Sequence, residues 1–288
     1  MKTLLTAAAI GLMAIVTSAQ STFDEGPDAT LKLAGSYVAR FVETFAAVIW
    51  REHYTQEDHA QRRFPASGTS FSQLVGRREL DSELLLLWLP RETSWIAVRD
   101  VTSVDGTPRR ADQRRVQAAL QSSDLSVDKL KALATENGRF NIGQIIRTFN
   151  EPTLALLFLD EHYRHRFSFR QIKREGVEGR RLATYEFVER ARPTVIQDRR
   201  RDVPSHGTVT LDESTGEVLQ TSLELSDAMG TIRGTMTVQY EPHDRFDVLV
   251  PVEMREEYAS VTGEHISAVA TYSDFRRFET AGRVVGIK

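Results

Sequence analysis

The feature that most constrains the fold is a long C-terminal stretch in which apolar and polar residues alternate. The clearest case is the segment 231–240, where Ile232, Met236 and Val238 share one face of an extended chain. The same two-residue period recurs along most of the chain after Asp160, with short polar turns and no helical pattern between the repeats. Strands joined this closely can pair only antiparallel. We therefore expect antiparallel strands over 161–280. The individual strands are expected at 163–170, 182–190, 206–211, 217–225, 231–240, 248–260 and 265–278.

The chain before this stretch combines one helix, a second group of strands and a helical middle. Apolar residues at helical spacing predict an amphipathic helix over 30–44, with Asp28 as a plausible cap. Strands are expected within 46–104, at about 46–55, 71–79, 83–89 and 93–104. Helices are expected over 111–160, including one over 139–150, because Ile142, Ile145 and Ile146 would share a face.

These elements together predict an α+β fold. We expect a strongly curved antiparallel sheet, half-barrel-like, that is covered on one side by the helical block 111–160. Residues 46–104 offer too few strands and too little helix to bury two faces alone. Residues 20–288 are therefore expected to form a single α+β domain in which strands from both sides of the helical block share one sheet.

The first 19 residues predict export. A short positive start at Lys2 precedes a 13-residue apolar run from Leu4 to Val16, and small residues lead up to Ala19. This is the organisation of a secretory signal peptide with cleavage after Ala19. The run is shorter than the roughly 20 residues of a membrane span. We expect a periplasmic or secreted protein without a transmembrane segment in the mature chain; an uncleaved anchor is the alternative.

Composition excludes several classes of protein. The chain has 288 residues, 41% of them hydrophobic, and no cysteine, so disulfide scaffolds and thiolate chemistry are excluded. Lys and Arg number 37 against 40 Asp and Glu, and acids stand beside most of the arginine clusters. A nucleic-acid-binding protein usually shows a basic excess, so no nucleic-acid partner is expected.

A search for catalytic and cofactor motifs is negative. The sequence lacks GxSxG, HExxH, GxxxxGK[ST] and GxGxxG patterns. Of the seven histidines, His162 and His165 would point to opposite faces of a strand, which makes them poor joint metal ligands. His165 shares a face with Phe167 and Phe169 and is interpreted as a core histidine. We expect no enzyme activity, no cofactor and no metal site.

Aromatic residues are the remaining candidates for function. In a curved sheet covered by helices they could line an apolar ligand cavity, although they could equally be ordinary core. The candidate ligand-binding residues are Trp50, Trp88, Phe158, Phe167, Phe169 and Tyr258.

Several phrases of the sequence resemble known families. The segments 94–106, 145–153, 189–194 and 211–219 resemble a family of uncharacterised secreted bacterial proteins, which implies no activity. The C-terminal part, with 250–251 leading to 272–278, resembles more distantly the periplasmic lipoprotein-carrier (LolA/LolB-like) group. That resemblance implies a half-barrel sheet with helices as a lid that shields a lipid chain from water.

Two functions from different classes follow, and an enzyme with a site assembled from distant residues is a third alternative. The first is a non-catalytic binding protein that holds a lipid or a lipidated or apolar ligand between the sheet and its helical lid, with lipid or a lipoprotein as partner. The second is a structural or interaction domain of the cell envelope with a filled core. A connected apolar cavity would favour the first, and close packing the second. Empty space beside Gly234 would let Gly234→Leu weaken binding without disturbing the fold, whereas a filled interior would be overpacked. The oligomeric state and the ligand are not indicated.

Overall fold

The computed structural model describes most of the chain from Pro27 to Arg277. The described ranges are 27–63, 69–89, 93–110, 126–145, 150–198, 201–226 and 229–277, with Arg91, Ala118, Ser122 and Arg147 as single residues. The predicted signal peptide and the predicted helix around 111–120 lie outside the described residues, apart from Ala118.

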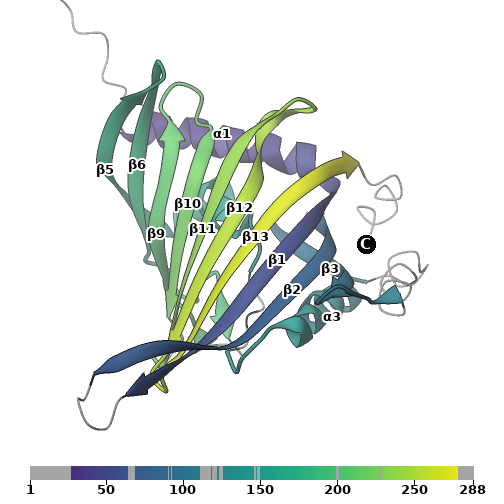
Figure 1. Ribbon diagram of the computed structural model, residues 1–288. Helices are drawn as coiled ribbons and strands as arrows, with labels where there is room; N and C mark the ends of the chain where they lie inside the picture. The colour runs from purple at the N-terminus through teal and green to yellow at the C-terminus, as the bar shows by residue number, and fades with distance from the viewer. Residues whose placement is uncertain are drawn as a thin grey trace, which may run out of the picture.

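One antiparallel sheet of eleven strands organises these residues (Figure 1). Its spatial order is β4-β3-β2-β1-β13-β12-β11-β10-β9-β6-β5, and it curves as an open half-barrel. Two short strands pair separately as β7 (Gln197–Asp198) and β8 (Arg201–Asp202). The bounds of the eleven strands are β1 Ala47–Arg63, β2 Ser70–Leu89, β3 Ser94–Val104, β4 Thr107–Pro108, β5 Phe167–Val177, β6 Arg180–Glu189, β9 Ser205–Asp212, β10 Val218–Ser226, β11 Ile232–His243, β12 Phe246–Ser260 and β13 Glu264–Arg277.

In this sheet the first strand in chain order pairs with the last. Strand β1 pairs with β13 from Val48 opposite Arg277 to Ala60 opposite Glu264. Strands from both ends of the chain therefore share one sheet, as the sequence predicts. The predicted strands 71–79 and 83–89 are one 20-residue strand, β2, since its polar residues around Asp81 continue the pairing with β1 without a break. With β1 it forms a hairpin whose far end extends beyond the other strands (Figure 1).

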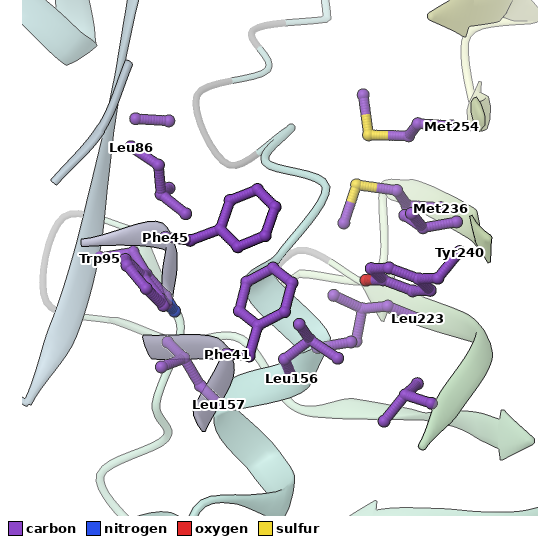
Figure 2. Packing of buried hydrophobic residues seen from close by; sticks show 14 of the residues in the cluster. Phe41, Phe45, Leu86, Trp95, Leu156, Leu157, Leu223, Met236, Tyr240 and Met254 are labelled. Carbon is purple, nitrogen blue, oxygen red and sulfur yellow. The ribbon is translucent and has the colours of Figure 1, made fainter. Parts of the chain in front are cut away.

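Helix α1 (Pro27–Phe45) lies across one face of the sheet, which we call the inner face (Figure 1). The helix contacts β1, β2, β9 and β12, and its Tyr37, Phe41 and Phe45 side chains are fully buried. Figure 2 shows Phe41 and Phe45 lying between Trp95 and Leu86 on one side and Met236 and Tyr240 on the other. A second covering element, the 3-10 helix η2 (Leu154–Leu159), is buried in the same cluster. The predicted helix over 30–44 is thus confirmed and begins three residues earlier.

Helix α3 (Val127–Glu136) packs on the opposite face of the sheet. Its Leu130 and Leu133 form a separate apolar cluster with side chains of β1, β2 and β3. The residues next to these strand residues in the sequence belong to the inner-face cluster. The alternation of a strand explains this, since Leu85 and Leu86 point to opposite faces. The predicted helical block is therefore not one layer on one side: α3 covers one face, and η2 lies with α1 on the other.

The described residues after Glu136 contain less helix than the sequence predicts. After η1 (Asn137–Phe140), the described residues from Asn141 to Thr153 form no helix, so the predicted helix over 139–150 is wrong. Gly143 takes a positive φ of 77°, and the Ile142 backbone N–H donates to the Gln56 side chain instead of to a helical carbonyl. Tertiary hydrogen bonds override the helical spacing of the isoleucines here.

Residues 161–164 form a short helix, α4 (Glu161–Arg164), rather than the start of a strand. The Asp160 carboxylate accepts a hydrogen bond of 2.8 Å from the His162 backbone N–H, which caps that helix. As a result His165 is exposed, so its interpretation as a core histidine is wrong. The later strands lie within two or three residues of their predicted bounds. Across the described residues, no helix has the length and hydropathy needed to cross a membrane.

Candidate functional site

Strand β1 carries charged and polar groups into the buried interior. Glu52, Tyr54 and Gln56 follow Trp50 at every second position and therefore point to the inner face. Glu52 and Gln56 are fully buried despite their polarity. Such groups are tolerated inside a protein only when they have hydrogen-bond partners.

Glu52 is paired with Arg99 of β3. The Arg99 Nε donates to one carboxylate oxygen and its Nη2 donates to the other at 2.9 Å, in a two-pronged ion pair. Arg99 Nη2 also lies 3.4 Å from the Asn150 backbone carbonyl, and the guanidinium lies over the Tyr54 ring. Burial alone would lower the pKa of Arg99, but the charge and hydrogen bonds of Glu52 raise it above its ordinary value. Arg99 therefore remains charged within the interior.

Tyr54 links this pair to β12. Its hydroxyl donates to Glu256 Oε2 at 2.5 Å, and the Asn150 side-chain amide lies 3.4 Å from the same hydroxyl. Burial raises the pKa of Glu256, although the hydrogen bond from Tyr54 and the nearby arginines oppose the rise. Burial likewise raises the pKa of Tyr54 well above its ordinary value, so it stays a donor. The contact therefore joins a carboxyl group of raised pKa to a phenol that stays protonated.

A second arginine, Arg147, holds the non-helical middle segment against the sheet. Its Nη2 donates to Gln56 Oε1, and its guanidinium lies over the ring of Tyr258, 5.4 Å from the centroid. Gln56 Nε2 in turn donates to the Phe140 carbonyl at 3.3 Å. Phe140, Ile142, Arg147 and Asn150 of the middle segment are therefore fixed to the inner face by side chains of β1, β3 and β12.

This buried network is suited to holding backbone in place rather than to chemistry. Each of its charged members has a partner, and Glu52, Arg99, Arg147 and Glu256 are all buried. Among the described residues, no group of three or more His, Asp or Glu side chains is arranged to hold a metal ion. Trp50 precedes Glu52, Tyr54 and Gln56 on the same face of β1, so the charged cluster lies directly beside the aromatic core.

The predicted tryptophan sites belong to the packed interior. Trp50 is fully buried, with its ring 5.7 Å from that of Phe45 and 5.6 Å from that of Phe275. Trp88 is half-buried and its ring lies 4.9 Å from that of Trp95. Both tryptophans contact core rings.

The predicted phenylalanine sites do come together. Phe158 of η2 stacks on Phe167 of β5 at 4.5 Å, and Phe169 lies 6.3 Å from Phe187 of β6. Phe167 and Phe169 also form part of the wall of an open hollow of about 480 Å³ between α1, α4 and β5. We call it the α1–β5 hollow. Its described lining is Leu31, Lys32, Glu161, Arg164, His165, Phe167 and Phe169.

A neighbouring hollow of about 570 Å³ shares Lys32, Glu161 and Arg164 and follows α1 as far as Ala39. Arg164 crosses α1 between the two, where its Nη1 donates to the Leu31 carbonyl at 2.8 Å. An added Cβ at Gly35 would lie 2.9 Å from that Nη1, so the glycine makes room for the crossing. The two hollows thus form the described surface along one side of α1.

Tyr258 lies apart from the other predicted site residues. It packs with Ile145 and Ile266 and opposes Gly234 on β11. A Cβ at Gly234 would lie 2.7 Å from two ring atoms of Tyr258, so the empty space considered beside Gly234 is absent at that position. The six predicted residues therefore fall into three groups, of which only the Phe158–Phe167–Phe169 group borders a hollow among those described here.

The buried charges escaped the sequence analysis, although one signal was available. Trp50, Glu52 and Tyr54 share a face of β1, so a glutamate stands on an apolar face. A lone acid in such a position demands a buried partner. Its partner Arg99 is 47 residues away, and the pairing of β1 with β2 and of β2 with β3 was needed to identify it.

Comparison with known proteins gives distant matches among solved structures, two of which are given below. No protein-family model and no curated protein matches the chain. A solved outer membrane lipoprotein-sorting protein domain from Vibrio parahaemolyticus is 16% identical with a TM-score of 0.34, over 90% of this chain and 93% of that one. A DUF1329 family protein from Desulfovibrio piger is 11% identical with a TM-score of 0.30, over 87% of this chain and 94% of that one. Both likenesses are distant, and nothing about a family, a ligand or a function follows from them.

Proposed function

We propose that this chain is an exported, non-catalytic binding protein that holds an acyl chain, free or on a lipid or lipoprotein, between the inner face of the sheet and the covering elements α1 and η2. The observation that supports the proposal is the α1–β5 hollow, whose wall includes Phe167 and Phe169. Phe167 stacks directly on the fully buried Phe158. An apolar chain that enters the hollow past its charged residues would therefore meet the aromatic core of the inner face at Phe167.

The hollow has the dimensions of a small-molecule site. Its volume of about 480 Å³ lies within the usual range of ligand pockets, and its lining combines three apolar residues with Lys32, Glu161, Arg164 and His165. Each buried methylene of a ligand contributes roughly 0.8 kcal/mol, so ten carbons could offset the cost of association. A longer chain would need η2 or α1 to shift, because Phe158 and Phe41 are already packed.

The experiment is a titration with an environment-sensitive fluorescent fatty acid at two salt concentrations. We expect saturable binding that tightens with chain length and depends little on salt, since apolar contact supplies the energy. Phe169→Ser should weaken binding at least about tenfold through the loss of buried apolar area. Ile172→Ser is the matched control, because Ile172 is exposed on the same strand and outside the hollow. Absence of a saturable signal, or an equal effect of both variants, would contradict the proposal.

The alternative of a filled-core interaction domain is favoured by a different observation. The Glu52–Arg99 pair and the Arg147–Gln56 contact fix Asn150 and Arg147 of the middle segment against the inner face. A ligand that needed this volume would have to break a buried ion pair. If the fatty acid fails to bind while the protein remains folded, this second function becomes the better interpretation.

Export is tested separately. N-terminal sequencing of protein recovered from the cell envelope should give a chain that begins at or near Gln20, since the small residues before it fit a cleavage site. A chain that still begins at Met1 would contradict cleavage.

A further inference from the structure

Three arginines surround a hollow at the other end of the sheet from the α1–β5 hollow. The hollow has a volume of about 400 Å³ and lies where β2, the end of β3 and η1 meet. Its described lining is Arg78, Val104, Arg109, Arg139 and Phe140, with no carboxylate among these residues. In a chain with a net charge of −3, three guanidinium groups around one hollow are a local concentration of positive charge, although Glu136, which is not part of the lining, forms an ion pair with Arg139.

Arg78 is held in place but retains bonding capacity. Its Nη1 donates to the Phe140 carbonyl at 3.2 Å, which fixes the guanidinium against η1. Its Nε is buried and has no hydrogen-bond partner among the described residues.

The other two arginines of the lining are Arg139 and Arg109. Arg139 lies over the Phe140 ring at 4.6 Å from its centroid, and its Nη1 donates to Glu136 at 2.9 Å, so its plane is oriented in advance. Arg109 follows β4, and its backbone N–H donates to the Thr102 carbonyl at 2.8 Å. No carboxylate of the described residues forms an ion pair with Arg109, and its side chain is exposed.

We propose that this hollow binds the phosphate group of a phosphorylated ligand. Guanidinium groups bind phosphate through paired charge-assisted hydrogen bonds, and three of them can contact different oxygens of one phosphate. Val104 and Phe140 form an apolar wall against which the carbon part of the ligand can pack. The site lies outside the residues of the acyl-chain proposal and does not depend on it. The phosphate can come from a soluble phosphate ester or from a phospholipid head group.

Isothermal titration tests the proposal with three probes: inorganic phosphate, glycerol 3-phosphate and a short-chain phosphatidic acid below its micelle concentration. We expect saturable binding of phosphate at low ionic strength that weakens as salt rises, because the contacts are electrostatic. Arg109→Gln should weaken binding roughly tenfold, and Arg109→Gln combined with Arg139→Gln should abolish it. Since Arg109 is exposed, its replacement should leave the fold intact, and thermal unfolding of the variant checks this.

Arg233→Gln is the matched control. It removes the same charge from an exposed position on β11, outside the hollow, and should leave binding unchanged. Tighter binding of the phosphatidic acid than of inorganic phosphate would assign a lipid head group, and equal binding of the three probes a soluble phosphate. Lack of saturable binding by all three, or equal effects of Arg109→Gln and Arg233→Gln, would overturn the proposal.

Discussion

Arg99 and Glu52 meet in a two-pronged ion pair in which both side chains are buried beneath the inner face of the sheet. The pair joins β3 to β1 across the intervening β2, and the Arg99 guanidinium also reaches the Asn150 carbonyl. One contact therefore connects two non-adjacent strands and the middle segment that lies over them.

The first prediction concerns this pair. Glu52→Gln or Arg99→Met alone should destabilise the protein by about 3–5 kcal/mol, because either change leaves an uncompensated buried charge or unpaired donors. Replacing both with apolar residues of similar volume should cost much less. Chemical denaturation of the two single variants and the double variant measures the coupling. Additive losses would show that the pair is not coupled.

The second prediction concerns the number of folding units. Strand β1 pairs with β13 over twelve residue pairs, so the N-terminal and C-terminal strands share their hydrogen bonds and the inner-face cluster. We expect the chain from Gln20 to unfold in one transition, as a single domain would. Calorimetry combined with circular dichroism measures it, and two well-separated transitions with a stable fragment of residues 20–150 would contradict it.

How far the sequence predicts this fold depends on how local each signal is. The alternation in 232–240 and the helical spacing of Tyr37 and Phe41 involve neighbouring residues, and the strands and α1 follow closely from them. The predicted helix over 139–150 does not form because the Gln56 side chain, more than eighty residues away, makes hydrogen bonds with the backbone of Phe140 and Ile142. No local pattern reports such a contact.

The candidate sites also differ in whether a local sequence pattern or only long-range contacts bring their residues together. The alternation along β5 placed Phe167 and Phe169 on one face, and they do border the same hollow. The arginine hollow joins Arg78, Arg109 and Arg139 from three elements. Each of these arginines looks like an ordinary solvated charge in the sequence, so only the strand pairing and the position of η1 bring them together.

The third prediction concerns pH. Burial raises the pKa of Glu151 to about 7, against the opposing effects of a hydrogen bond from the Ala97 backbone N–H and of the nearby Arg99 charge. A carboxyl group with a raised folded-state pKa favours folding in its protonated form. Its contribution is therefore complete below pH 4.5, the pKa of the unfolded chain, and is lost as pH rises through about 7.

Glu151→Gln keeps a neutral side chain at every pH and should remove this dependence. Between pH 5 and 8 the variant should gain stability relative to the native chain, by at most about 3 kcal/mol. Urea denaturation at several pH values measures the difference. Parallel pH profiles for the two proteins would show that Glu151 ionises normally in the folded chain.

The last prediction compares two glycines on β9 and β11, the strands on either side of β10. A Cβ at Gly207 of β9 would lie 1.9 Å from the Ser222 carbonyl oxygen of β10, whereas a Cβ at Gly234 of β11 would lie 2.7 Å from the ring of Tyr258. The Ser222 carbonyl belongs to the paired backbone and can shift only by distorting the sheet. The ring of Tyr258 can rotate or move, although it is closely packed by Ile145 and Ile266.

Both alanine variants are overpacked, and such changes typically cost about 1–3 kcal/mol. We therefore expect Gly207→Ala to exceed this range and Gly234→Ala to fall within it, as measured by thermal and urea unfolding. A more harmful change at Gly234 would mean that the Tyr258 ring is held more rigidly than the backbone of β10.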